Sequence, residues 1–240
     1  MALRQPRHWP EKSTRYNPYF GVELPPAKNV FNVGGRDRLG RKGDNYGIQT
    51  TGEKSDVLTL TSALQNTIRF HGTKPAIVDA EGNLTWSEYG QSIARSAGML
   101  RDLGINAGQR FGIFCRNCRR QGELIYAGYW SGAVPVPINY RLAPGEIGQI
   151  LDDAECRQLA IDPAFMHILE HPAIASWRGR AFALGPERTR TDIPFFDDLR
   201  AAAEPLEATH LDELDEALML YTGGTTGAGK GVKISHRNIV

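Results

Sequence analysis

Three features are scarce in this 240-residue sequence: cysteine, long apolar runs, and excess charge of either sign. The three cysteines are too few for a disulfide framework, which favours a reducing, cytoplasmic compartment. No apolar run approaches the ~18 residues of a membrane span, and the first residues lack the apolar stretch of a secretory signal. The net charge of +1 gives no reason to expect a nucleic acid or an acidic membrane as the main partner.

The chain divides near residue 55. Residues 1–55 hold seven glycines, five prolines and ten Lys or Arg against five Asp or Glu, without a helical or alternating apolar period. We therefore expect an irregular basic arm. Its six aromatic residues argue against plain disorder, because disordered segments are usually aromatic-poor. The function of this arm cannot be inferred from the sequence.

Residues 56–240 alternate between helical and strand patterns. We expect helices over residues 56–70, about 122–130 and 144–155. We expect a further helix that Ser87 caps at its start and Gly104 ends. We expect strands over 76–79 and 84–86, joined by the turn 81–83, and over 111–115, 134–138, 158–161 and 217–221. Pro135 and Pro137 mark residues 134–138 as an irregular or edge strand. This rhythm predicts an α/β fold, a mostly parallel sheet with helices on both faces.

A glycine-rich segment follows the strand expected at residues 217–221. It reads Thr-Gly-Gly-Thr-Thr-Gly-Ala-Gly-Lys-Gly-Val over residues 222–232. Glycines let the backbone turn sharply, so that successive N–H groups form a concave nest for phosphate oxygens. Thr222, Thr225 and Thr226 add hydroxyl donors, and Lys230 adds a positive charge. A surface turn that binds nothing is disfavoured, because glycines, hydroxyls and a lysine converge directly after a strand.

Two kinds of phosphate loop compete for this segment. Residues 224–230 match the first seven positions of a Walker A loop, but the eighth should be Ser or Thr and is Gly231. A Walker loop also opens into a helix, whereas residues 231–235 have the pattern of a strand. The nucleoside triphosphatase reading is therefore the weaker one.

Residues 221–238 resemble the phosphate-loop signature of the adenylate-forming superfamily, which includes acyl-CoA synthetases, peptide-synthetase adenylation domains and luciferases. That signature runs Tyr-Thr-Ser/Gly-Gly-Thr-Thr-Gly-x-Pro-Lys-Gly-Val, followed by Ser-His-x-Asn, and this chain has Ser-His-Arg-Asn at 235–238. Residues 107–155 resemble the first subdomain of an acyl-CoA synthetase, and the similarity extends over about 57–240. Gly229 departs from the family by replacing the usual Pro, which raises the cost of ordering the loop by ~0.4–1 kcal/mol.

The resemblance implies a two-step ligase that uses ATP, Mg²⁺ and coenzyme A. A carboxylic acid, fatty or otherwise, would attack the α-phosphate of Mg-ATP, and a thiol would then displace AMP to give a thioester. Lys230 and Thr226 would stabilise the leaving pyrophosphate as catalytic residues. We assign no residue as a resident metal ligand. The expected nucleotide-binding residues are Thr222, Gly223, Gly224, Thr225, Thr226, Gly227 and Lys230.

The resemblance also implies that later segments of the family lie outside these 240 residues, among them the substrate pocket and the C-terminal domain with its catalytic Lys. We expect the AMP-binding portion to be truncated after the phosphate loop, and the 240-residue chain alone to form no acyl-AMP. The alternative function is a non-catalytic fragment that binds nucleotide weakly or serves as an interaction surface. The oligomeric state and the acid cannot be predicted.

Three other patterns are weaker. Residues 167–171 read His-Ile-Leu-Glu-His, an inverted zinc-protease pattern, but prolines confine it to about two turns and no third ligand is identifiable. Cys115 and Cys118 have Cys-x-x-Cys spacing without a second pair, so Cys115 is best explained as a core residue at a strand end. His236 either approaches the nucleotide or starts a helix, and the sequence leaves both open.

Overall fold

The computed structural model describes residues 15–17, 22–24, 58–186, 192–222 and 229–240. The chain divides into one compact unit over Met1–Thr51 and another over Gly52–Val240. In the first unit, β1 (Arg15–Asn17) pairs antiparallel with β2 (Val22–Leu24). The sequence analysis, which expects an irregular arm, did not predict this short hairpin. Strands of three residues are too short to show the two-residue alternation by which a strand is recognised.

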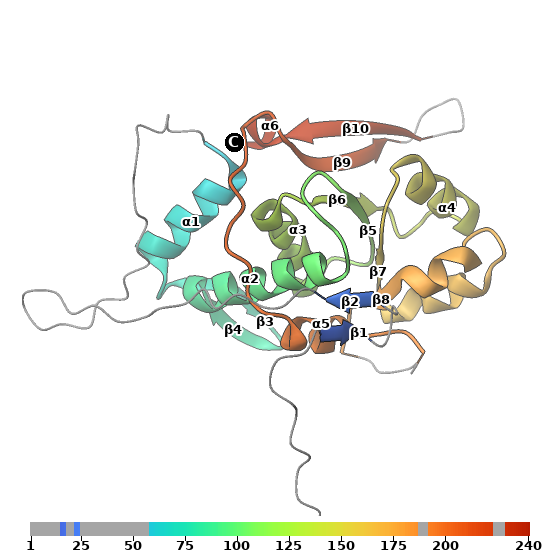
Figure 1. Ribbon diagram of the computed structural model, residues 1–240, viewed down its shortest axis with the longest axis horizontal. Helices are drawn as coiled ribbons and strands as arrows, with labels where there is room; N and C mark the ends of the chain where they lie inside the picture. Colours follow the sequence, from blue (N-terminus) through green and yellow to red (C-terminus); the bar gives the residue numbers. More distant parts are fainter. Residues whose placement is uncertain (1–14, 18–21, 25–57, 187–191, 223–228) are drawn as a thin grey trace, which may run out of the picture. The chain divides into compact units, whose positions relative to one another are not determined.

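The second unit is built on a parallel four-stranded sheet, as predicted (Figure 1). Its strands lie in the order β6–β5–β7–β8, and every neighbouring pair is parallel. The strands are β5 (Arg110–Phe114), β6 (Val134–Ile138), β7 (Leu159–Ile161) and β8 (Ala181–Ala183). The proline-containing strand β6 is at the edge, which confirms the interpretation of its prolines, since a central strand would need the missing N–H groups.

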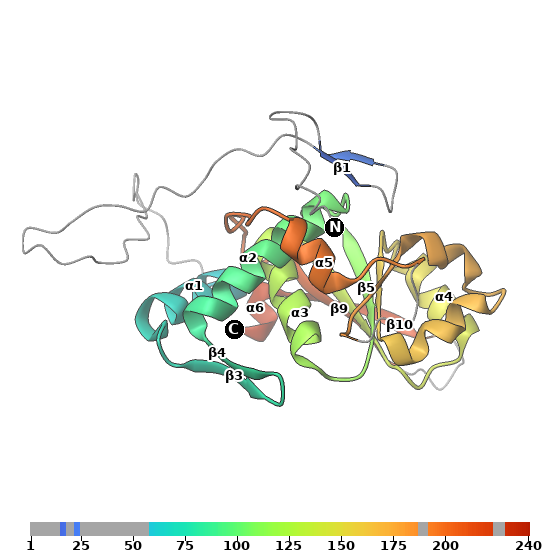
Figure 2. The ribbon, with the colours of Figure 1, turned by 90° about the horizontal axis from the view of Figure 1, so that it is seen from below.

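Helices cover both faces of this sheet (Figure 2). One face carries α2 (Trp86–Asp102), α3 (Arg119–Ser131) and α5 (Phe196–Ala202). The other carries α4 (Pro144–Asp153) and two 3-10 helices, η1 (Pro163–Glu170) and η2 (Ala175–Arg180). Strand side chains alternate between the two faces, so burial on both sides explains the continuous apolar run of β5. No helix among the described residues has both the length and the apolar character of a membrane span.

A helix and a hairpin precede the sheet. These are α1 (Leu60–His71) and the antiparallel pair β3 (Pro75–Asp79) and β4 (Gly82–Thr85). Thr85, and not Ser87 as predicted, caps α2. Glu88 decides this, because its carboxylate accepts the Thr85 N–H at 2.8 Å while its own N–H donates to Thr85 Oγ1 at 3.3 Å. Gly104 follows the end of α2 with φ +78°, the left-handed conformation expected of a glycine there.

The first turn of α3 is held by a buried arginine. The Arg120 guanidinium donates to both carboxylate oxygens of Glu81, at 2.7 and 2.8 Å, and to Asp197 at 2.9 Å. These bonds join the β3–β4 turn to α3 and α5. A buried arginine with two carboxylate partners fixes geometry, because moving it would leave a buried charge uncompensated. The turn that starts α3 is therefore rigidly placed.

Candidate functional site

The candidate phosphate loop connects the two strands of an antiparallel hairpin. These strands are β9 (Glu216–Thr222) and β10 (Lys230–Ser235). Thr222 and Lys230 are directly opposite each other in the register and both are exposed, so the two side chains mark the open end of the hairpin. The other expected nucleotide-binding residues, Gly223, Gly224, Thr225, Thr226 and Gly227, lie outside the described residues.

Lys230 is available to an anion. It begins β10, and it forms no ion pair with any residue in the described part of the chain. The residues after it form a strand, as the sequence predicted, whereas a Walker A loop would continue into a helix there. The structure thus agrees with the adenylate-forming interpretation of the loop and not with the nucleoside triphosphatase one.

The loop end of β9 is anchored to α4. The Tyr221 hydroxyl donates a hydrogen bond to the Asp153 carboxylate at the end of that helix. Burial, the larger effect, and this hydrogen bond together raise the pKa of the Tyr221 hydroxyl well above its usual value. Gly231 is opposite Tyr221, and a Cβ added there would collide with Met219 Cε and lie 3.0 Å from Tyr221 Cζ. A side chain at this position, such as the Ser or Thr of a Walker A loop, would therefore have to displace the end of Met219 and crowd the Tyr221 ring.

An ion pair anchors the other end of β9. Arg110, the first residue of β5, donates from Nε to Glu216 at 2.9 Å and from a terminal nitrogen at 2.5 Å. The two side chains are 16% and 18% exposed, so this bidentate pair is largely shielded from water. The hydrogen bond to Glu216 is the largest of the effects that raise the pKa of Arg110. Both ends of β9 are thus fixed to the parallel sheet and its helix.

Sequence reasoning missed both anchors. Arg110 and Glu216 are 106 residues apart, and Tyr221 and Asp153 are 68 residues apart. No local pattern links such partners. The only usable signal was that Tyr221 immediately precedes the glycine-rich segment, where a fixed side chain would hold the start of the loop.

His236 has a structural role. It begins α6 (His236–Ile239) and is 1% exposed. Its Nδ1 accepts the Leu60 N–H at 3.3 Å, and its ring meets the Tyr129 ring edge-on, with centroids 5.9 Å apart. Burial lowers the pKa of the imidazole, with Asp215 acting in the opposite direction. Of the two roles that the sequence left open, the structure supports the helix start.

The zinc pattern is not assembled as a metal site. Residues 163–170 form a 3-10 helix, so the α-helical spacing that would align His167 with His171 is absent. In the described ranges, no group of three or more His, Cys, Asp or Glu side chains could hold a metal ion. The prolines that flank this segment explain its short and irregular helix.

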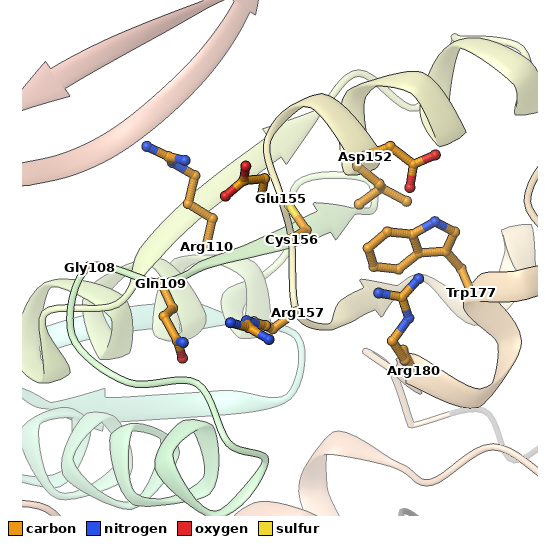
Figure 3. A pocket seen from close by; sticks show the side chains of 10 residues that line it. Gly108, Gln109, Arg110, Asp152, Glu155, Cys156, Arg157, Trp177 and Arg180 are labelled. Carbon is orange, nitrogen blue, oxygen red and sulfur yellow. The ribbon is translucent and has the colours of Figure 1, made fainter.

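A polar cavity opens beside the base of the hairpin (Figure 3). Its volume is about 440 Å³, and Figure 3 shows Arg110, Arg157 and Arg180 among the side chains that line it. The Arg180 guanidinium carbon lies 3.7 Å from the centroid of the Trp177 ring, a cation–π contact that fixes one wall. Thr222 and Lys230, the two predicted nucleotide-binding residues that the structure describes, do not line this cavity. Its lining consists of Gly108, Gln109, Arg110, Leu151, Asp152, Glu155, Cys156, Arg157, Trp177 and Arg180.

Comparison with known proteins identifies the family. Residues 64–240, which include both strands of the hairpin, match the family described as AMP-binding enzyme. The chain belongs to the AMP-binding enzyme family. This finding confirms the resemblance stated from the phosphate-loop residues, and it confirms the α/β fold as that of the N-terminal part of an adenylate-forming enzyme.

Several relatives within the family are CoA ligases. The 3-methylmercaptopropionyl-CoA ligase of Ruegeria lacuscaerulensis is 32% identical over 199 residues, which cover 76% of this chain and 36% of the relative. The 3-hydroxybenzoate/4-hydroxybenzoate CoA ligase of Thauera aromatica is 32% identical over 177 residues, covering 70% and 33%.

A solved structure of an adenylate-forming enzyme has the same fold over this part of the chain. The ATP-bound MatB of Rhodopseudomonas palustris superposes with a TM-score of 0.63 at 26% identity, covering 74% of this chain and 35% of that one. The chain therefore spans about a third of the length of these proteins.

Proposed function

We propose that this chain supplies the ATP-binding part of a carboxylate–CoA ligase. The observation that supports it most is the hairpin: Thr222 and Lys230 are exposed at its open end, on either side of a glycine- and threonine-rich loop. Family membership and the CoA ligases among the relatives point the same way. We also propose a domain boundary near residue 55, with the arm before it and the AMP-binding portion after it.

The proposed reaction has two steps. The carboxylate of the acid attacks the α-phosphorus of Mg-ATP, the bond to pyrophosphate breaks, and an acyl-AMP forms. The thiol of coenzyme A then attacks the acyl carbon and AMP leaves, which gives a thioester. ATP, the acid and coenzyme A are substrates, and we propose that Mg²⁺ enters bound to the ATP phosphates. The related ligases act on different acids, so the acid is proposed only as a carboxylic acid, fatty or otherwise.

The loop residues would act on the leaving group. Negative charge grows on the β- and γ-phosphates as pyrophosphate departs, and preorganised donors aimed at that charge lower the barrier. We propose that backbone N–H groups of Gly223, Gly224 and Gly227, the hydroxyls of Thr222, Thr225 and Thr226, and the Lys230 ammonium supply these donors. The anchored ends of β9 would keep the loop in place, so that little reorganisation is needed during the reaction.

Separate assay of the two steps tests this proposal in a ligase that contains the segment. Lys230→Ala should slow carboxylate-dependent ATP–pyrophosphate exchange ~10²–10³-fold. Thioester formation from supplied acyl-AMP should change much less, because pyrophosphate has already left. Lys233→Ala is the matched control, since Lys233 is also exposed on β10 but three residues along, on the opposite face. Equal losses in both steps would refute the assignment of Lys230 to the leaving group.

A further inference from the structure

The polar cavity of Figure 3 is lined by charges of both signs. One of its arginines, Arg110, is already committed, because its guanidinium forms the bidentate pair with Glu216. The other charged side chains of the lining are Arg157, Arg180, Asp152 and Glu155. The charges of these four sum to zero, which matches a ligand that carries one charge of each sign better than it matches a simple anion.

The four charged side chains do not neutralise one another. Among the residues that the structure describes, none of them has an ion-pair or hydrogen-bond partner for its charged group. In the view of Figure 3, the carboxylates of Asp152 and Glu155 lie on one side of the cavity, and the guanidiniums of Arg157 and Arg180 lie on the other. Opposite charges that line one cavity without pairing leave a gap that a ligand with both charges can bridge.

The two carboxylates lie at the end of a helix where negative charge is unfavourable. Asp152 is in the last turn of α4, Glu155 is two residues beyond the end of that helix, and the last turn holds no basic residue. The C-terminal end of a helix carries partial negative charge, so it favours a cation and disfavours further anions. An ammonium group bound between Asp152 and Glu155 would therefore be stabilised by both carboxylates and by the helix end.

Glu155 has a backbone conformation that usually belongs to glycine. Its φ is +53°, and every other described residue with positive φ is a glycine. The position follows the cap of α4, where glycine is usual because it has no Cβ to clash in the left-handed conformation. Backbone strain of this kind gathers at functional sites. What glutamate adds over glycine here is a carboxylate that lines the cavity.

The two guanidiniums come from neighbouring strands of the parallel sheet. Arg157 lies two residues before β7 and Arg180 lies directly before β8, and these strands pair with Leu159 opposite Ala181. Parallel strands begin at the same edge of a sheet, so the two arginines lie at that edge. The contact with the Trp177 ring holds the Arg180 guanidinium without using a hydrogen-bond donor. Guanidinium donors match the two oxygens of a carboxylate.

We propose that this cavity binds a small amino carboxylate, such as an α-amino acid. The carboxylate of the ligand accepts hydrogen bonds from Arg157 and Arg180, and its ammonium group donates to Asp152 and Glu155. The cavity volume of about 440 Å³ lies in the range of small-molecule sites. Binding is reversible and forms no covalent bond.

Titration of the ¹⁵N-labelled chain with amino acids tests the proposal. The indole N–H of Trp177 reports on the cavity, because this ring is part of the lining. Each common amino acid is added to about 10 mM, where a Kd in the millimolar range is still visible. At least one should shift this signal saturably. Its N-acetyl derivative and its carboxamide should each bind at least about tenfold more weakly, because each has lost one of the two charges.

Variants of the lining locate the binding site. Arg180→Met and Glu155→Gln should each weaken binding about tenfold or more. Calorimetry supplies the Kd of Arg180→Met, because this change alters the surroundings of Trp177. Glu155→Gly should weaken binding as much as Glu155→Gln without lowering the melting temperature, since glycine relieves the left-handed strain. Arg69→Met and Glu207→Gln are the matched controls, exposed and outside the cavity, and should leave the Kd unchanged.

Three results would overturn the proposal. The first is the absence of a saturable shift with every amino acid. The second is equal binding of the N-acetyl derivative or of the carboxamide, which would make the cavity a simple anion site or a simple cation site. The third is a Glu155→Gly variant with an unchanged Kd and a lowered melting temperature, which would give Glu155 a purely structural role.

Discussion

Replacing His236 tests whether this histidine supports the fold or contacts the nucleotide. Its ring is 1% exposed, and Nδ1 accepts the Leu60 N–H at 3.3 Å. The backbone N–H of His236 also donates to the Asp215 carbonyl at 3.1 Å. The side chain therefore joins α6 to the start of α1, two segments that are 176 residues apart in the chain.

The expected cost follows from these contacts. His236→Ala leaves the Leu60 N–H without its acceptor, which costs about 1–3 kcal/mol. Loss of the buried ring beside Tyr129 adds a cavity, so the free energy of unfolding should fall by about 2–4 kcal/mol in total. His236→Asn places a side-chain oxygen near the position of Nδ1 and should lose about half as much.

The stability that His236 contributes should decrease as the pH is lowered. Burial lowers the pKa of folded His236 below 6.5, so between the two values the unfolded chain binds more protons. The contribution of this residue to the free energy of unfolding is complete above about pH 6.5. It is lost as the pH falls through the lowered pKa of the folded state. Urea unfolding at about pH 7.5 and pH 5.5 measures how far the free energy of unfolding falls as the pH is lowered. The fall should be smaller in His236→Asn, because that variant lacks the imidazole that titrates.

ATP titration of the same variants decides between the two roles. We expect ATP affinity to stay within about twofold while the free energy of unfolding falls, because the ring faces α1 and Tyr129. Unchanged stability together with a tenfold or larger loss of ATP affinity would refute the structural assignment.

Two further changes probe the hairpin. Arg110→Met leaves Glu216 largely shielded and unpaired, so urea unfolding should show a loss of about 1–3 kcal/mol; no loss would mean that the pair is not formed. Gly231→Ala crowds the Tyr221 ring, which Asp153 holds in place, whereas the end of Met219 can move aside, so it should cost about 1 kcal/mol by the same measurement; a gain of stability would contradict the described packing.

Local patterns predicted most of the sheet and the nature of the loop. The apolar runs of β5 and β6, and the prolines that place β6 at the edge, are properties of short segments. The strand after Lys230 was likewise predicted from the sequence, because residues 231–235 have the pattern of a strand. Each of these conclusions depends on residues that are close neighbours in the chain.

Contacts between distant residues account for most of what was missed. Nothing near Arg110 indicates Glu216 as its partner, and nothing near Tyr221 indicates Asp153. Burial in β9 was also misjudged. Its continuous apolar run predicts burial on both faces, yet Ala217 and Met219 are buried while Leu220 is 37% exposed. Whether a second layer covers an apolar face depends on tertiary contacts that a strand's own sequence does not encode.

Pyrophosphate binding to Lys230 and Lys233 variants tests whether this hairpin loop holds the phosphates. Lys230 lies at the open end of the hairpin, whereas Lys233 lies three residues further along β10. Calorimetric titration of the chain with magnesium pyrophosphate should show a 10–100-fold weaker Kd for Lys230→Ala, about the value of one charge-assisted hydrogen bond, and less than a twofold change for Lys233→Ala. Equal weakening by both substitutions, or none by Lys230→Ala, would contradict the claim that this hairpin loop holds the phosphates.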